Sequence, residues 1–221
     1  IYCCKDDHDY YSHAETLVID FDFDYSNQLF GNEGERFFYN GKSAPYAFFG
    51  TGLLAAPFLF IGDILDKLIP GGEMFNYKII FYSFSPIFYL FFTFLIFNRI
   101  NEFFGRKFSS YFLYLLILGS GVGFYAFERF SMSHVYEVFT ISLLIYYCIK
   151  FYMFDKNNYL ISVIPFLMML AVMTRWVNIY ILLVPYLIGK LTHNKTKNLF
   201  KNKYFVGSSI LSSLIFLLHT Y

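Results

Sequence analysis

The stretch that decides the fold is residues 79–98, IIFYSFSPIFYLFFTFLIFN, which runs for twenty residues without a charge. A helix of that length is about 30 Å long at 1.5 Å per residue, which matches the hydrocarbon core of a bilayer. Its apolar residues fall on every side of such a helix rather than along one stripe, as expected for a segment inside a membrane. The stretch therefore predicts a transmembrane helix.

Five further uncharged or nearly uncharged runs of 16–20 residues follow it along the chain. They cover residues 108–127, 136–153, 159–174, 176–191 and 204–221. The two shortest runs are separated only by Arg175, so we expect either a tight helical hairpin or a broken helix at that point.

The composition agrees with lipid as the solvent. Of the 221 residues, 57% are hydrophobic, 24% are aromatic and only 15% are charged, and the mean hydropathy is +0.47. A soluble domain of this length does not need so much apolar surface to fill one core. We therefore predict an all-α polytopic membrane protein with about six spans, and we exclude a soluble enzyme, a nucleic-acid-binding protein and a disordered protein.

The near-zero net charge hides an asymmetry between two parts of the chain. Residues 1–76 contain twelve acids and four bases, whereas the remaining residues contain thirteen bases and four acids. This pattern predicts that residues 1–76 are the first external loop and that residues 77–221 form the transmembrane bundle. The chain begins at Ile1 without a Met or a signal peptide and stops in an apolar stretch. We therefore expect a fragment that lacks at least the first span and the C-terminal part.

The loops between the six runs predict the orientation through the positive-inside rule. When the sides alternate, one side receives ten bases and the other receives Arg129 and Arg175. The ten bases are Arg99, Arg106, Lys107, Lys150, Lys156, Lys190, Lys195, Lys197, Lys201 and Lys203. We predict that the ten-base side is cytoplasmic and that the acidic head is external.

Residues 43–62, SAPYAFFGTGLLAAPFLFIG, complicate this orientation because they are apolar enough to form one more span. A true crossing there would move the acidic head to the cytoplasmic side. Four glycine and proline positions weaken a regular helix, and Asp63 and Asp66 follow at once. We therefore favour re-entrant or interfacial helices over residues 43–69 on the outer face, with a true crossing as the alternative.

The clearest candidate for chemistry is the polar segment 5–15, KDDHDYYSHAE, at the start of the predicted external loop. Its carboxylates and imidazoles are costly beside lipid unless they serve a solvated site. A solvated acidic loop is the alternative interpretation. Arg175, between two short spans, is a second candidate, and an arginine that snorkels to the interface is the alternative there.

Residues 9–15, DYYSHAE, resemble the Asp-x-x-x-x-Ala-Glu element that begins the first external loop of GT-C glycosyltransferases. That superfamily includes the protein O-mannosyltransferase and aminoarabinose-transferase type, known as glycosyltransferase family 39, and the oligosaccharyltransferase catalytic subunit. Four further stretches resemble segments of the superfamily in the same order along the chain. They are residues 17–28, 42–62, 131–134 and 174–178.

The resemblance implies a GT-C-like helical bundle with a large first external loop. It implies a membrane enzyme that takes a sugar from a polyprenyl-phosphate donor and transfers it to a lipid, glycan or protein acceptor on the outer face. The expected location is a bacterial-type plasma membrane, in contact with membrane lipids and without nucleic acid as a partner.

Transfer of a sugar to a hydroxyl needs a carboxylate that takes the hydroxyl proton, and a fixed cation stabilises the departing phosphate. Asp9 fits the catalytic base best because its spacing to Glu15 matches the family element, and Asp7 is the second choice. Arg175 is the leading cation for binding the donor phosphate. His134 and Glu137 are further candidates for contacts to phosphate or acceptor, with a simple polar loop as their alternative.

A divalent cation is doubtful because the sequence departs from the metal-binding members. Oligosaccharyltransferase-type enzymes carry an Asp-x-Asp in the second external loop that helps to bind the metal, whereas residues 128–137 contain no such pair. This favours the metal-independent, family-39-like branch. The alternation Asp20-Phe21-Asp22-Phe23-Asp24 also contains acids, but we expect packed aromatic rings and solvated carboxylates there rather than a metal-binding edge.

Two other functions remain open on the residues alone. A lipid-linked-sugar flippase or transporter would place ionisable groups within the spans near the midplane. Here these groups gather in the first loop and between the spans, which favours the enzyme. An O-antigen-type polymerase is a further alternative, since it also acts on prenyl-linked sugars.

Overall fold

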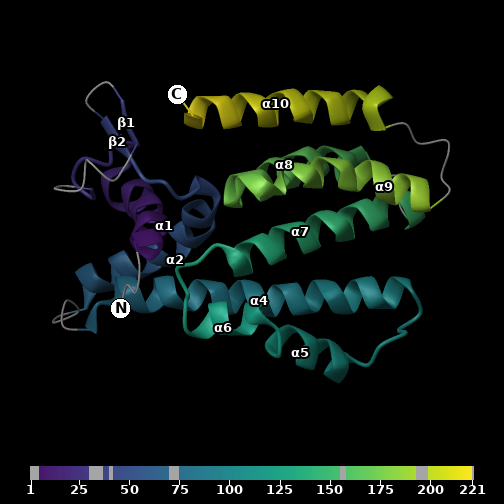
Figure 1. Ribbon diagram of the computed structural model, residues 1–221, viewed down its shortest axis with the longest axis horizontal. Coiled ribbons are helices and arrows are strands. Elements are labelled where there is room, and N and C mark those ends of the chain that lie inside the picture. The colour runs from purple at the N-terminus through teal and green to yellow at the C-terminus, as the bar shows by residue number, and fades with distance from the viewer. Residues whose placement is uncertain are drawn as a thin grey trace. The chain divides into compact units, whose positions relative to one another are not determined.

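The computed structural model describes residues 5–29, 37–39, 42–69, 75–154, 158–192 and 199–220. The chain, coloured by residue number in Figure 1, divides into two compact units. Unit 1 comprises Ile1–Phe91 and Leu118–Tyr136, and unit 2 comprises Phe92–Ile117 and Glu137–Tyr221.

Unit 1 is built on two helices and a short hairpin that precede the first long span. Its elements are α1 (Lys5–Glu15), the π-helical turn η1 (Thr16–Asp20), the strands β1 (Phe37–Tyr39) and β2 (Lys42–Ala44), α2 (Phe49–Leu68), the first half of α4 (Tyr77–Phe103) and α6 (Gly121–Phe127). The strands pair antiparallel with Phe38 opposite Ser43. The sequence analysis expected only interfacial helices in this region, so the hairpin is new.

Residues 43–62 do not form the predicted pair of re-entrant helices, because α2 runs unbroken from Phe49 to Leu68 and includes Pro57. Two of its glycines mark close contacts rather than breaks. A Cβ on Gly52 would lie 2.4 Å from the Cβ of His13 in α1, and one on Gly62 would lie 2.5 Å from the carbonyl oxygen of Tyr77 in α4. Only glycine lets these backbones approach so closely.

Unit 2 contains most of the remaining apolar helices. Its elements are the second half of α4, α5 (Ser110–Leu118) up to Ile117, α7 (His134–Ile149) from Glu137 onward with its π-helical extension η3 (Lys150–Phe154), α8 (Asn158–Thr174), the 3₁₀ helix η4 (Trp176–Leu183), α9 (Val184–Leu191), the 3₁₀ turn η5 (Leu199–Lys201) and α10 (Lys203–Thr220). Buried side chains of Leu144, Cys148 and Ile164 form the centre of its core, and Phe205 of α10 joins them.

Arg175 marks a helical hairpin, one of the two forms that the sequence allows. α8 ends at Thr174, and η4 with α9 returns alongside it (Figure 1). The Asn178 side-chain amide donates to the carbonyl of Ala171 at 2.8 Å, which joins the two arms across the turn. Ile181 on the returning arm belongs to the same buried cluster as Leu167 on α8.

Three helices within the described part of the chain are long and apolar enough to cross a membrane. They are α2, α4 and α7 extended by η3, and the bent pair of α5 and α6 adds a fourth if it counts as one span. The helices of residues 159–174, 176–191 and 203–217 are apolar but shorter. The structure therefore confirms a helical protein, but its described residues contain three or four candidate spans where the sequence predicts about six. One of them is α2, whose length and composition allow the crossing that the sequence analysis gave as the alternative to a surface position.

In unit 2, most basic residues and the Arg175 turn lie at opposite ends of the helices. The C-terminal ends of α4 and α9, η3 and the start of α10 lie at one end of the unit, and the turn between α8 and η4 lies at the other (Figure 1). The basic end carries seven of the ten bases that the sequence places on one side: Arg99, Arg106, Lys107, Lys150, Lys190, Lys201 and Lys203. Lys156, Lys195 and Lys197 lie outside the described residues.

Candidate functional site

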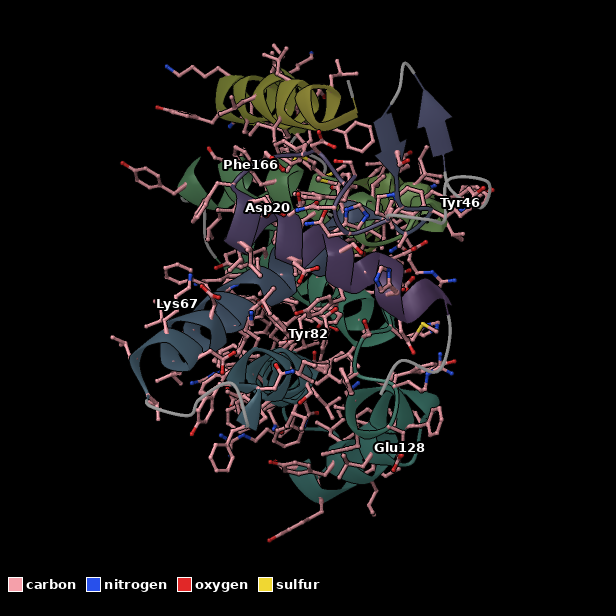
Figure 2. All side chains as sticks on the ribbon, turned by 90° about the vertical axis from the view of Figure 1, so that its left-hand side faces the viewer. Asp20, Tyr46, Lys67, Tyr82, Glu128 and Phe166 are labelled. Carbon is pink, nitrogen blue, oxygen red and sulfur yellow. The ribbon has the colours of Figure 1, made fainter. Side chains whose placement is uncertain are left out.

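The acidic helix α1 is buried in unit 1, although it carries charged side chains. Asp9 is 1% exposed and Asp7 is 4% exposed, while Ser12 and Ala14 on the same helix are fully buried. One Asp9 carboxylate oxygen, Oδ2, accepts a hydrogen bond of 3.1 Å from the backbone N–H of Tyr46. Tyr46 lies between β2 and α2, close to the purple helix α1 in Figure 2, so the segment that leads into α2 covers Asp9.

Asp7 joins α1 to a segment more than a hundred residues later in the chain. The Arg129 guanidinium lies 3.4 Å from Asp7 Oδ2 and 3.5 Å from Oδ1. Ser131 donates its hydroxyl hydrogen to the Asp7 carbonyl at 2.6 Å, and the Tyr82 hydroxyl lies 3.1 Å from the Ser131 hydroxyl oxygen. The structure therefore brings together the first acidic segment and the predicted second external loop.

His134 begins α7 and contacts an aromatic ring of unit 1. The centroids of the His134 and Tyr125 rings are 3.9 Å apart, with the ring planes tilted by 36°. Glu137 follows one turn later on the same helix. The two predicted substrate-binding residues of α7 therefore point to different partners, since Glu137 contacts Arg175.

Arg175 and Glu137 form an ion pair in unit 2. The Arg175 Nη1 atom donates to Glu137 Oε2 at 3.1 Å, and the side chains are 38% and 17% exposed. Arg175 is the last residue before η4, and the exposed Trp176 follows it. The predicted site residues thus fall into two groups, one around α1 in unit 1 and one around the Arg175 turn in unit 2.

Glu15, at the end of α1, lies in a mixed-charge cluster. Burial raises the pKa of its carboxyl group above the ordinary value, the negative charge of Asp20 raises it further, and Lys78 acts in the opposite direction. The Lys78 ammonium also lies 3.9 Å from an Asp63 carboxylate oxygen, and Lys67 lies 2.6 Å from the other. Glu15 therefore contributes to the charge balance among α1, α2 and α4.

His13 connects three segments of unit 1, which the sequence analysis did not predict. Its Nε2 lies 2.8 Å from the carbonyl oxygen of Ala47, and its Nδ1 lies 2.8 Å from the Tyr25 hydroxyl. A carbonyl only accepts, so Nε2 donates to Ala47, and in the neutral ring Nδ1 then accepts from the Tyr25 hydroxyl. Burial, with a smaller effect from Asp22, raises the pKa of the Tyr25 hydroxyl, which keeps that donor protonated.

The acids after α1 are used in local hydrogen bonds. Asp22 accepts from the Thr16 hydroxyl at 3.0 Å, and Asp20 accepts from the side-chain amides of Asn27 and Gln28. Within the described residues, no three His, Cys, Asp or Glu side chains are grouped to hold a metal ion. The expected packing of the aromatic rings is found only in part, because Phe21 is 76% exposed, whereas the Phe23 ring, 57% exposed, has its centroid 5.8 Å from that of Phe49.

Arg129 is the site residue whose role sequence reasoning missed. The sequence shows it as one base in a short loop, and nothing in its neighbours indicates that it pairs with Asp7. The contact of Asp9 with Tyr46 was equally hidden, because it uses a backbone N–H that every residue except proline carries. Neither contact has a local sequence signal.

The fold and the candidate site together define a helical protein with three or four helices able to cross a membrane and with buried carboxylates in the segment that precedes them. Comparisons with protein-family models, with curated proteins and with solved structures found no match.

Proposed function

We propose that the chain is a multi-pass membrane glycosyltransferase that moves a sugar from a polyprenyl-phosphate donor to a lipid, glycan or protein acceptor. The observation that carries the proposal is the contact of α1 with residues 129–131, through the Arg129 ion pair and the Ser131 hydrogen bond to Asp7. Two polar segments that the resemblance assigns to one external face lie against each other in unit 1. Such a polar layer beside apolar helices suits a reaction between a lipid-linked donor and a polar acceptor.

Asp9 is proposed as the general base and Asp7 as its positioning neighbour. The Arg129 guanidinium already binds the Asp7 carboxylate, which suits a structural ion pair better than a proton acceptor. The Asp9 carboxylate accepts a hydrogen bond from the backbone N–H of Tyr46, and its spacing to Glu15 matches the family element. An acceptor hydroxyl that displaces the segment around Tyr46 would meet this oxygen at hydrogen-bonding distance, and Asp9 would take its proton as the new glycosidic bond forms.

Arg175 is proposed to bind the phosphate of the donor, with Glu137 as its partner when no donor is bound. A guanidinium carries its N–H donors in a planar fork whose geometry matches two oxygens of a phosphate. Two parallel hydrogen bonds to phosphate oxygens would stabilise the negative charge that develops as the prenyl phosphate leaves. The accessible side chain of Arg175 suits this role.

The proposed protein lies in a bacterial-type plasma membrane, with α1 on the non-cytoplasmic face and the basic end of unit 2 in the cytoplasm. This orientation requires α2 to lie on the outer surface, because a crossing by α2 would place α1 in the cytoplasm. This assignment is supported by the bases at that end, since positive residues concentrate in cytoplasmic loops. The proposed reaction needs no metal ion. His134 and Glu15 are assigned to the acceptor side, near the segments that carry Asp9.

Cysteine labelling tests the orientation directly. Single cysteines replace the exposed Ser26 and the exposed Lys201 in a chain whose three native cysteines are changed to serine. We expect Ser26→Cys to react with an impermeant maleimide in intact cells and Lys201→Cys to react only after lysis. If Lys201→Cys reacts in intact cells, or if both sites react only after lysis, the external site is wrong.

Donor cleavage tests the activity without knowledge of the acceptor. Purified chain in lipid nanodiscs is incubated with synthetic polyprenyl-phosphate sugars that differ in the sugar, together with a membrane extract as the acceptor source. We expect release of prenyl phosphate from one class of sugar, at the same rate with and without a chelator. Movement of intact donor between leaflets of vesicles without cleavage would instead establish the flippase.

A further inference from the structure

The basic end of unit 2 contains an apolar groove that the proposed reaction does not use. Its volume is about 740 Å³, within the range of about 300–1,000 Å³ that is usual for ligand pockets. One wall is Ile145, Ile149 and Met153 on α7 and η3, and the other is the stripe of Leu187, Ile188 and Leu191 on α9. Side chains three or four positions apart share a helix face, so each wall is a continuous apolar surface.

A close contact between the two walls forms the floor of the groove. A Cβ on Gly189 of α9 would lie 2.7 Å from the ring of Tyr152, which is itself 3% exposed. The missing side chain at Gly189 lets this ring, which lines the groove, sit against the α9 backbone. Leu187 and Leu191 remain 49% and 76% exposed, so the groove is open along its length.

Lysines are next in the chain to residues that line the groove. Lys150 follows Ile149 directly and Lys190 precedes Leu191, while Lys107 lines a smaller neighbouring pocket of about 270 Å³. Phe104 lines both pockets and therefore connects them. An elongated apolar slot with cations at the helix ends is complementary to a molecule with a hydrocarbon chain and an anionic head.

We infer that this groove binds an anionic glycerophospholipid of the surrounding membrane, with an acyl chain between α7 and α9 and the phosphate beside Lys150 and Lys190. Basic pockets between membrane helices on the cytoplasmic side hold anionic headgroups, and each lysine adds to the attraction. A zwitterionic lipid fills the same slot with its acyl chain but has no net charge for the lysines to attract. The inference needs the helices to lie in a membrane, and it does not depend on transferase activity.

Photocrosslinking of the purified full chain in nanodiscs tests the site. Phosphatidylglycerol and phosphatidylcholine, each with a diazirine in one acyl chain, are added in trace amounts to phosphatidylcholine nanodiscs, and the labelled peptides are identified by mass spectrometry. We expect phosphatidylglycerol to label α9 and the α7–η3 segment at least tenfold more than phosphatidylcholine does. Equal labelling by the two lipids would mean that the groove contacts lipid without a preference for the anionic headgroup, and it would overturn the inference.

Matched variants distinguish lipid binding in this groove from a general attraction of anionic lipid to positive charge. The double variant Lys150→Gln/Lys190→Gln should reduce phosphatidylglycerol labelling about fivefold for each lysine. The control variant Lys201→Gln/Lys203→Gln removes the same charge from the same end of unit 2 and should leave the labelling unchanged. Leu187→Trp should block the groove, and Leu182→Trp, also on the returning arm and exposed, should not. Equal losses in the two lysine pairs would overturn the inference.

A competition experiment settles the chemical class of the lipid. Unlabelled phosphatidylglycerol should displace the photoreactive lipid from α9 at lower concentration than a short polyprenyl phosphate does, because the groove is assigned to membrane lipid rather than to the sugar carrier. Stronger displacement by the polyprenyl phosphate would overturn the assignment. Since labelling is read without turnover, the result is independent of whether the chain transfers a sugar.

Discussion

We expect Asp9→Asn to lower the release of prenyl phosphate by about 10²–10⁴-fold, the usual contribution of a general base. The substitution is nearly isosteric and removes only the ability to take the acceptor proton. The Asn side-chain carbonyl can still accept the hydrogen bond that Tyr46 N–H donates to Asp9. The melting temperature and the affinity for the donor should therefore stay close to those of the unchanged chain. The measurement is donor turnover in nanodiscs beside a thermal unfolding curve.

Two neighbouring aspartates provide the controls for this result. Asp20→Asn changes a carboxylate whose partners are the Asn27 and Gln28 amides, and it should retain most of the turnover. Asp7→Asn removes a carboxylate that forms a largely buried ion pair with Arg129, so its main effect should be a lower melting temperature. A stable Asp7→Asn variant without turnover, together with an active Asp9→Asn variant, would transfer the role of the base to Asp7.

The helices could be predicted from the sequence where hydropathy alone determines them. Residues 79–98 fall inside α4, and residues 136–153 fall inside the continuous helix of α7 and η3. The same reasoning misjudged the continuity of α2, because it treated Gly52 and Gly62 as positions that weaken a helix. In the structure these glycines are contact points for α1 and α4, and a packing role of that kind depends on partners that the local sequence does not show.

The residues proposed for the site could be chosen from the sequence, whereas their contacts could not. Charges beside apolar segments are conspicuous, so Asp7, Asp9 and Arg175 could all be selected from the sequence. Their partners could not, since Arg129 lies 122 residues from Asp7 and Glu137 lies 38 residues from Arg175. Both ion pairs form only because the fold brings residues together that are far apart in the sequence. The ion pair of Arg175 with Glu137 adds a second possible role for this arginine. Arg175 either stabilises the fold through Glu137 or binds the phosphate of the donor.

Substitutions on both sides of this ion pair distinguish the two roles. If Arg175 binds phosphate through two parallel hydrogen bonds, Arg175→Lys keeps the charge but loses the planar fork, and the KM for the donor should rise about tenfold. Arg175→Ala should raise it further. A snorkelling arginine or a simple partner of Glu137 needs only a positive charge on a long stem, so lysine would then serve almost as well.

Glu137→Gln provides the opposite test, because it removes the carboxylate that occupies Arg175 when no donor is bound. If phosphate and Glu137 compete for the guanidinium, this variant should keep the unchanged KM for the donor or lower it, while Arg175→Ala raises it. If the ion pair only joins α7 to the turn before η4, both variants should lower the melting temperature by similar amounts and leave KM unaffected. The measurement is donor KM and kcat at saturating acceptor, with thermal unfolding of each variant. Unchanged kinetics in Arg175→Lys together with equal destabilisation of Arg175→Ala and Glu137→Gln would reject the phosphate role.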